Sequence, residues 1–169
     1  MKSTGEVMGI WADFGGAFAK AQIAAGNKLP LGGCVFISVR DEDKPSILPV
    51  AAELYRLGFK IIATGGTGRY LREHEIMVEV VPKVGEGTRP HIVDMIKSKK
   101  VDMVINTSFG AKSVMDSYSI RRTSLEFGLP YFTTVAGARA ASMGIRSFLK
   151  DGLSVKSLQE YHQAMPQGR

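Results

Sequence analysis

The sequence predicts an α/β protein, a three-layer sandwich built on a five-stranded, mainly parallel, doubly wound sheet. Two observations favour this class. Short apolar runs alternate with segments of helical periodicity along most of the chain, which is typical of strands joined by crossover helices. The apolar runs also suit strands that are buried on both faces of a parallel sheet.

Five strands and six main helices are expected. The strands are expected at residues 34–39, 59–63, 77–81, 101–105 and 131–133. The helices are expected at residues 14–25, 46–57, 69–75, 90–98, 120–127 and 135–149. Residues 109–116 are expected to be loop, and the pair Ser157 and Glu160 has the spacing of a capping box for a last short helix.

Three helix starts carry specific expectations. Asp13 is the expected N-cap of the first helix, whose buried stripe would consist of Phe14, Phe18, Ala21 and Ala25. Ser46 is the expected N-cap of the second helix, because that start keeps Pro49, which lacks an N–H, in the first turn. Pro90 is expected at the first position of the fourth helix.

The chain divides into three parts on composition. Residues 1–32 form an N-terminal extension with a helix and a linker rich in loop-forming residues. Residues 33–163 hold the alternating strands and helices, and residues 164–169 are a tail that is expected to be disordered.

Composition excludes several classes of protein. The hydrophobic content of 44% and charged content of 22% are ordinary for a soluble chain of 169 residues, and no apolar run approaches the roughly 20 residues of a membrane span. The net charge is +6, but the basic residues are dispersed, so nucleic acid is not an expected partner. The single Cys34 cannot form an intrachain disulfide, which fits a reducing, cytoplasmic setting. The three histidines lack metal-ligand spacing.

The stretch from Ile61 to Gly68 is the strongest functional signal. A buried strand leads into Thr64-Gly65-Gly66-Thr67-Gly68, after which helical periodicity resumes. Glycines leave backbone N–H groups accessible and a helix N-terminus favours anions, so this turn is a candidate phosphate site. The spacing matches neither a dinucleotide fingerprint nor a Walker A loop. A tight turn with a threonine N-cap remains the structural alternative.

Other polar residues are expected to join this turn. Right-handed crossovers place the carboxyl ends of parallel strands on one edge of the sheet, where open α/β sheets bind ligands. Lysine suits phosphate, and asparagine suits a ribose or a base edge. The residues delivered to this edge are Ser38, Lys44, Thr64, Gly66, Thr67, Lys83, Asn106, Thr107 and Ser108. No acid–base pair for catalysis is evident among them.

Several separated motifs resemble one known family. These are Ser38-Val39-Arg40 with Asp43-Lys44, Ala63-Thr64-x-Gly66-Thr67, Lys83-Val84, Arg89-Pro90-His91-Ile92, Ile105-Asn106-Thr107 and Ile120-Arg121-Arg122. Together they resemble the methylglyoxal-synthase-like regulatory domain at the C-terminus of the carbamoyl phosphate synthase large subunit. Residues 1–9 look like the end of that subunit's second ATP-grasp unit.

The resemblance implies that the chain is an allosteric part of a larger glutamine-hydrolysing ligase of arginine and pyrimidine biosynthesis. It implies a nucleoside monophosphate effector, UMP or IMP, with the phosphate at Lys44, Thr64, Thr67 and Lys83 and the nucleoside near Ser38, Asn106 and Ser108. It also implies that the remaining large-subunit domains and the small glutaminase subunit are partners. ATP and Mg²⁺ would serve the parent enzyme, with no cofactor in this part of it, and a homo-oligomer is an open expectation.

Two enzymes on related folds remain as alternatives. A stand-alone methylglyoxal synthase needs a carboxylate base beside the phosphate site, which the family places in a Gly-Asp pair; here the corresponding loop reads Gly85-Glu86-Gly87-Thr88. The purine-pathway cyclohydrolase shares the strand–turn–helix layout, but its motifs do not match after Thr67. A regulatory domain without chemistry of its own is therefore the favoured prediction.

Overall fold

The computed structural model describes residues 5–82, 84–107, 111–152 and 154–164. Its strands are β1 (Cys34–Ser38), β2 (Lys60–Ala63), β3 (Val78–Val80), β4 (Met103–Asn106) and β5 (Tyr131–Phe132). Its helices are α1 (Phe14–Ala24), α2 (Lys44–Arg56), α3 (Gly65–Glu73), α4 (Ile92–Lys97), α5 (Ala111–Glu126), α6 (Val135–Asp151) and α7 (Leu158–Ala164). Two 3₁₀ turns, Asp41–Asp43 and Val84–Glu86, precede α2 and α4.

The five strands form one sheet in the order β3-β2-β1-β4-β5, and every neighbouring pair is parallel. This confirms the predicted doubly wound α/β class. Each predicted strand is present within about two residues of its expected bounds. The chain leaves β1 toward β2 and β3, then returns to place β4 on the other side of β1.

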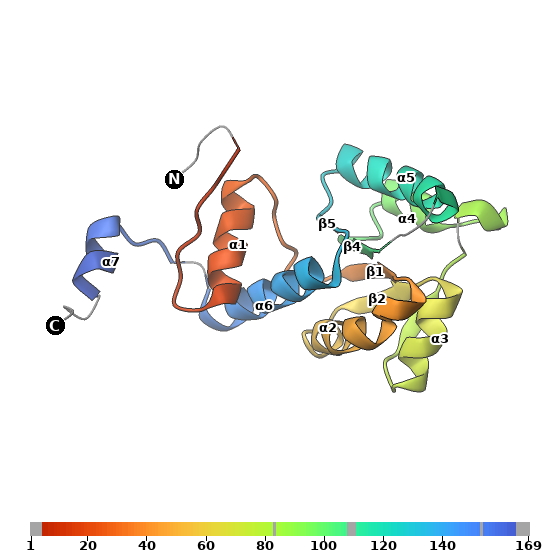
Figure 1. Cartoon of the computed structure of the whole chain (residues 1–169), viewed down its shortest axis with the longest axis horizontal. Coiled ribbons are helices and arrows are strands. Elements are labelled where there is room, and N and C mark those ends of the chain that lie inside the picture. Colours follow the sequence, from red (N-terminus) through yellow and green to blue (C-terminus); the bar gives the residue numbers. More distant parts are fainter. Residues whose placement is uncertain (1–4, 83, 108–110, 153, 165–169) are drawn as a thin grey trace.

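Helices cover both faces of the sheet (Figure 1). On one face, the side chains of Val35, Ile37 and Ile61 pack with residues of α2, α3 and α6. On the other face, Phe36 and Ile62 pack with residues of α4 and α5. Since successive residues of each strand enter opposite clusters, both faces of the central strands are buried, and this explains why the strands read as continuous apolar runs.

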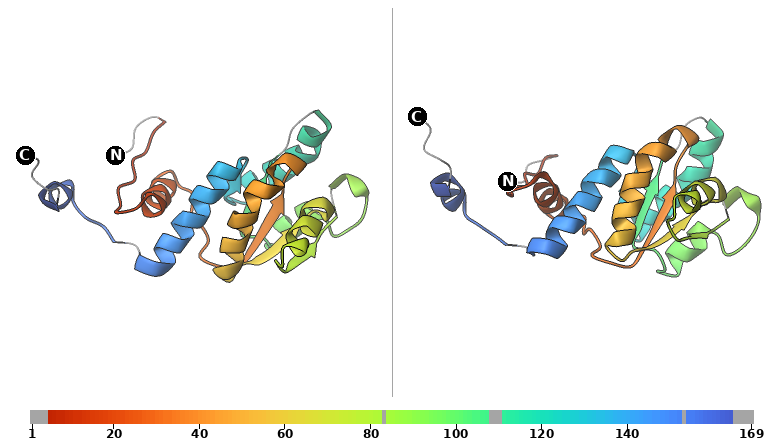
Figure 2. Two further views of the ribbon diagram at one scale, coloured as in Figure 1. Left: turned by 60° about the horizontal axis from the view of Figure 1, so that its bottom comes forward. Right: turned by 90° about the horizontal axis from the view of Figure 1, so that it is seen from below.

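The first helix packs on α6, which Figure 2 shows between α1 and α2. Asp13 caps α1 as expected, because its Oδ1 accepts a hydrogen bond from the N–H of Gly16 at 2.8 Å. The predicted buried stripe is wrong in part. Phe14 is 62% exposed, and the buried residues are Gly15, Gly16 and Ala19.

Small residues allow the two helix backbones to approach closely. A Cβ placed on Gly144 of α6 would lie 3.0 Å from the Cβ of Ala19 and 3.1 Å from the carbonyl oxygen of Gly15. Gly144 therefore serves the packing of α1 on α6, although glycine lowers helix propensity by about 1 kcal/mol relative to alanine.

Four other predicted helix starts differ from the structure. α3 begins at Gly65 and not at the expected residue 69, so the Gly-rich stretch is part of the helix. α2 begins at Lys44, directly after the turn Asp41–Asp43, so Ser46 is not its N-cap and Pro49 lies inside the helix. α4 has His91 as its N-cap, which leaves Pro90 outside it. α5 begins at Ala111, so a helix replaces most of the loop expected at residues 109–116; residues 109 and 110 lie outside the described residues.

The last helix joins the N-terminal segment. The predicted capping box is present, with the N–H of Ser157 bonded to Glu160 Oε2 and the N–H of Glu160 bonded to Ser157 Oγ. The hydroxyl of Tyr161 donates to the carbonyl of Ile10 at 3.1 Å and accepts from Lys20 Nζ at 3.3 Å. Lys20 Nζ also lies 4.2 Å from the ring centre of Trp11. The predicted tail beyond Ala164 lies outside the described residues.

Within the described ranges, no helix combines the length and the apolar character that a membrane crossing requires.

Candidate functional site at the carboxyl edge of the sheet

Strand order reverses between β1 and β4, and open α/β sheets bind ligands at such a point. Ser38, the last residue of β1, lies in register with Asn106, the last residue of β4. Thr107 continues from β4, and its N–H donates to the carbonyl of Ser38 at 3.0 Å. Thr64 follows β2 on the other side of β1. We call this carboxyl edge, with the starts of α2 and α3, the rim.

The Gly-rich stretch forms the first turn of α3. Thr64 is the N-cap residue, and its side chain makes no capping hydrogen bond. The first N–H groups of a helix have no partner within the helix, and Gly65 and Gly66 are exposed. The start of α3 therefore offers backbone donors and partial positive charge to an anion.

Lys44 supplies a full positive charge at the same place. A Cβ placed on Gly66 would lie 3.6 Å from Lys44 Nζ, so the ammonium sits beside the first turn of α3. Lys44 is also the first residue of α2, and its side chain is 19% exposed. Two residues 22 positions apart in the sequence are thus neighbours at the rim.

Two of the predicted hydroxyls hold the rim together. Thr67 is 1% exposed, and its Oγ1 accepts from the N–H of Val39 at 3.1 Å and donates to the carbonyl of Val39 at 3.3 Å. Thr107 Oγ1 accepts from the N–H of Arg40 at 3.2 Å. These contacts fix the loop after β1 to α3 on one side and to β4 on the other.

The remaining predicted side chains make two further contacts, one between Ser38 and Thr64 and one between Asn106 and a tyrosine. Ser38 Oγ and Thr64 Oγ1 are 3.1 Å apart and share a hydrogen bond. Asn106 Nδ2 donates to the hydroxyl of Tyr131 at 2.9 Å, which leaves the amide oxygen as an acceptor. The structure thus gathers Ser38, Lys44, Thr64, Gly66, Thr67, Asn106 and Thr107 at the rim. Lys83 and Ser108 lie outside the described residues.

Three partners of the site were missed by the sequence reasoning. Asp41 Oδ1 is 2.7 Å from Lys44 Nζ. Asp43 pairs with Arg40 at 2.7 Å, and the hydrogen bond from Arg40, together with one from the Thr107 hydroxyl, lowers the pKa of the Asp43 carboxyl. Tyr131 lies on the neighbouring strand. The charged loop after β1 was a visible signal for the two carboxylates, but nothing in the sequence indicated which cation each would meet.

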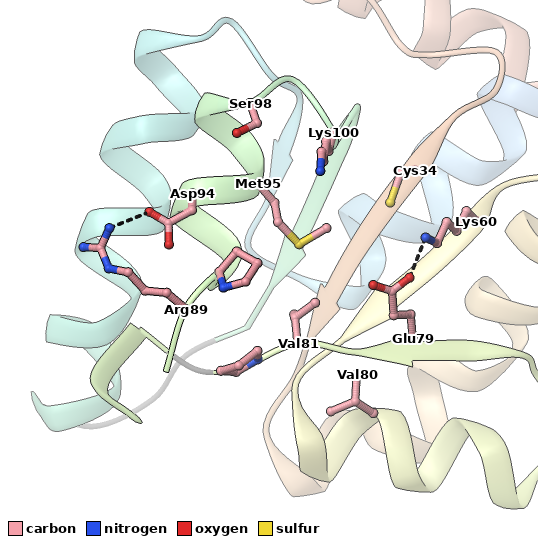
Figure 3. A pocket seen from close by; sticks show the side chains of 12 residues that line it. Cys34, Lys60, Glu79, Val80, Val81, Arg89, Asp94, Met95, Ser98 and Lys100 are labelled. Carbon is pink, nitrogen blue, oxygen red and sulfur yellow. Dashed lines mark hydrogen bonds and ion pairs between the residues drawn. The ribbon is translucent and has the colours of Figure 1, made fainter. Parts of the chain in front are cut away.

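A separate hollow of about 600 Å³ lies between α4 and the sheet, and it is lined by residues of α4, of the amino ends of β1 and β2 and of β3 and the segment after it (Figure 3). Its charges are arranged as the pairs Lys60–Glu79 and Arg89–Asp94, with Lys100 nearby. Cys34 also lines it, and burial raises the pKa of this thiol to about 11, so the thiol is neutral and unreactive at neutral pH. Among the described residues, no group of three or more His, Cys, Asp or Glu side chains is placed to hold a metal ion.

Comparison with known proteins identifies the family. A family model described as the MGS-like domain matches residues 46–133, which include the first turn of α3, the end of β4 and most of the sheet. The chain belongs to the MGS-like domain family.

Curated relatives of this MGS-like domain are large chains of carbamoyl phosphate synthase. It is 51% identical over 161 residues to that of Nostoc sp. and 52% identical over 161 residues to that of Myxococcus xanthus. The alignments cover 95% of this chain but only 14% and 15% of those proteins. It is also 50% identical over 164 residues to a carbamoyl phosphate synthase large chain, C-terminal section, from Methanopyrus kandleri, covering 96% of this chain and 30% of that one.

Solved structures agree on the fold. A methylglyoxal synthase from Elizabethkingia anophelis matches with a TM-score of 0.56 at 19% identity, covering 83% of this chain and 97% of the other. ForH matches with a TM-score of 0.52 at 19% identity, covering 71% of this chain and 80% of the other. At 19% identity, these matches support a shared fold and no shared function.

Proposed function

We propose that this MGS-like domain is the allosteric, effector-binding part of a carbamoyl phosphate synthase large chain, and that its effector is a nucleoside monophosphate such as UMP or IMP. The observation that carries the proposal is the position of the Lys44 ammonium beside the exposed first turn of α3. The relatives named carbamoyl phosphate synthase large chain support the choice of parent enzyme.

The rim offers distinct groups for the two halves of such a ligand. Lys44 and the N–H groups of Gly65 and Gly66 suit the phosphate, because a point charge and a helix N-terminus both favour an anion. Asn106, whose amide oxygen can accept a hydrogen bond, and the Ser38–Thr64 hydroxyl pair suit the ribose and the base. We further propose that Lys83 and Ser108 join the phosphate and nucleoside contacts, respectively.

Micromolar affinity requires contacts with both the phosphate and the nucleoside of the ligand. A helix N-terminus contributes about 0.3–1 kcal/mol to binding of an anion, whereas micromolar affinity corresponds to about 8 kcal/mol. Phosphate capture alone is therefore too weak, and contacts of the nucleoside near Asn106 must supply much of the rest.

The chain's own role is regulatory under this proposal. Ligase chemistry, with ATP and Mg²⁺, would belong to other domains of the longer large chain, which with the small glutaminase subunit would be its partners in the cytoplasm. The fold likeness to a methylglyoxal synthase does not favour the lyase alternative, because it extends to the fold alone. Formation of methylglyoxal from dihydroxyacetone phosphate by this chain would revive that alternative.

Calorimetric and thermal-shift titration of the chain with UMP and IMP tests the proposal. Saturable binding should raise the melting temperature, by the equivalent of about 2.7 kcal/mol when the ligand is at a hundred times its Kd. Lys44→Gln should weaken binding roughly tenfold to a hundredfold, because a hydrogen bond to a charged group is lost.

Lys100→Gln is the matched control, since it removes the same charge from an exposed lysine at the other end of the strands. It should leave the Kd unchanged. A folded chain that shows no binding at millimolar nucleotide would exclude UMP and IMP as effectors.

A further inference from the structure

The side-chain amide of Asn106 is oriented by a residue of the neighbouring strand. Asn106 is the last residue of β4, and Tyr131 is the first residue of β5, which pairs with β4. The Nδ2 of Asn106 donates a hydrogen bond to the hydroxyl of Tyr131 at 2.9 Å. Since the nitrogen and the oxygen of an amide point in different directions from the same carbon, this contact turns Oδ1 away from Tyr131.

The ring of Tyr131 is well supported. It packs against the buried cluster on the α4 and α5 face of the sheet. The guanidinium carbon of Arg121, on α5, lies 5.8 Å from the ring centre, at a distance where a cation is attracted to the face of an aromatic ring. The side chain of Asn106 is buried as well. The Tyr131 hydroxyl is therefore a fixed partner for the amide nitrogen.

The amide lies where the nucleoside of the effector is proposed to bind. Asn106 is in register with Ser38, whose hydroxyl shares a hydrogen bond with that of Thr64. An amide oxygen accepts hydrogen bonds and donates none. A ligand atom that meets Oδ1 must consequently be a donor.

We propose that Tyr131 is a positioning residue that makes the site selective for bases with an imino N–H, as in uracil and hypoxanthine. This inference rests on the proposed function, since it concerns the base of the same nucleoside monophosphate. N3 of uracil and N1 of hypoxanthine each carry a proton that Asn106 Oδ1 accepts. The same positions of cytosine and adenine carry no proton at neutral pH, so each would place a second acceptor against the oxygen.

The selectivity depends on the orientation of the amide. An amide that turns about its last bond exchanges a donor for an acceptor and can pair with either kind of base. In the structure, the nitrogen has its partner in Tyr131, so the oxygen is the atom offered to a ligand. Without the Tyr131 hydroxyl the nitrogen loses that partner, and it gains a new one by turning toward the acceptor of cytosine or adenine.

Two pairs of nucleotides test the selectivity. UMP and CMP have the same ribose and phosphate and differ in the base, and IMP and AMP differ in the corresponding way. In calorimetric titrations of the chain, the Kd of UMP should be about tenfold to a hundredfold lower than that of CMP, as expected for a good base contact. IMP should be favoured over AMP by a similar factor.

Tyr131→Phe keeps the ring and removes the hydroxyl. The preference for UMP over CMP, and for IMP over AMP, should fall to about threefold or less, because the amide is then able to turn. A merely structural role of Tyr131 would weaken all four nucleotides by the same factor and leave both ratios unchanged. The ratio, and not the affinity for one nucleotide, is therefore the decisive measurement.

Tyr55→Phe is the matched control. It removes a phenolic hydroxyl from a tyrosine that is 39% exposed near the end of α2, whereas the proposed site includes the start of that helix. All four affinities, and so both ratios, should stay as they are in the natural chain.

The outcomes separate this inference from the proposed function. Equal binding of UMP and CMP by the natural chain, or an unchanged preference in Tyr131→Phe, would overturn the role of Tyr131 and leave a nucleoside monophosphate as the effector. A preference for CMP and AMP would also overturn it, because the amide would then offer its nitrogen. If the folded chain binds none of the four nucleotides, the proposed function fails and this inference fails with it.

Discussion

The two ends of the same parallel strands carry polar residues that are arranged in opposite ways. At the carboxyl ends, Lys44 meets a helix start, and hydroxyls join one loop to the next. At the amino ends, charges are paired across neighbouring strands, as in Lys60–Glu79, and the carboxylate of Asp102 accepts from the N–H of Cys34 at 2.7 Å. The hollow of about 600 Å³ includes residues of this second end.

The two ends differ in what they offer to an anion. In the hollow, most of the charged groups have partners within the chain. The rim combines a lysine with the N–H groups of a helix start, and the Asp41 carboxylate beside this lysine is 92% exposed. The N–H groups of a helix start favour an anion, and this is why we propose the rim and not the hollow as the anion site.

The largest expected effect concerns the amino end, where the backbone is tightly constrained. Gly33 has a φ of +105°, and a Cβ there would lie 2.1 Å from the Asp102 oxygen that is bonded to Cys34. Gly33→Ala should lower the free energy of unfolding by about 3 kcal/mol, through backbone strain and the loss of that hydrogen bond. Chemical denaturation measures it.

Gly32→Ala is its control, since a Cβ on Gly32 meets nothing within 4 Å. It should change stability by less than about 1 kcal/mol. Equal effects of the two substitutions would show that the constraint at the amino end is not specific to Gly33.

A smaller effect is expected from the hydroxyl network at the rim. Thr67→Val keeps the shape of the side chain but removes both hydrogen bonds to the backbone of Val39. Leaving these buried groups unpaired should lower the free energy of unfolding by about 2 kcal/mol. Urea denaturation checks this, with the exposed Thr133→Val as control. A loss no larger than that of the control would mean that the rim is held by packing alone.

The smallest effect is expected from the paired charges of the amino end. Lys60 and Glu79 are 2.5 Å apart, and the carboxylate of Glu79 raises the pKa of Lys60, but both side chains are more than half exposed. Because water screens such pairs, Lys60→Gln should leave the denaturation midpoint unchanged within experimental error. If Lys60→Gln clearly lowered the midpoint in the natural chain but not in a Glu79→Gln background, the stability of this end would depend on its ion pair.

The fold was predictable because its signals are local. Buried parallel strands read as apolar runs, and Asp13 and the Ser157–Glu160 pair mark helix starts within four residues of sequence. The exceptions have physical reasons. The buried face of α1 consists of glycine and alanine, which carry little hydrophobic signal, and α2 contains Pro49, so the sequence favoured a later start.

The sequence predicts which residues lie at the rim, but it does not predict which residues they contact. Topology alone brings the ends of β1, β2 and β4 together, so Ser38, Thr64 and Asn106 could be named from the sequence. The partners could not, because Thr67 bonds to a residue 28 positions away and Asn106 to one 25 positions away. Whether a threonine hydroxyl serves the fold or a ligand is decided by such long-range contacts. Binding by these residues stays a prediction.

The contact between Tyr161 and Ile10 indicates where a support or a label can be joined to the chain. These two residues lie with α1 and α7 at one end of the long axis of the molecule, and α2 and α3 lie at the other (Figure 1). A support or a label joined close to this contact therefore lies far from the rim, so immobilised chain is suitable for testing the proposed ligands directly.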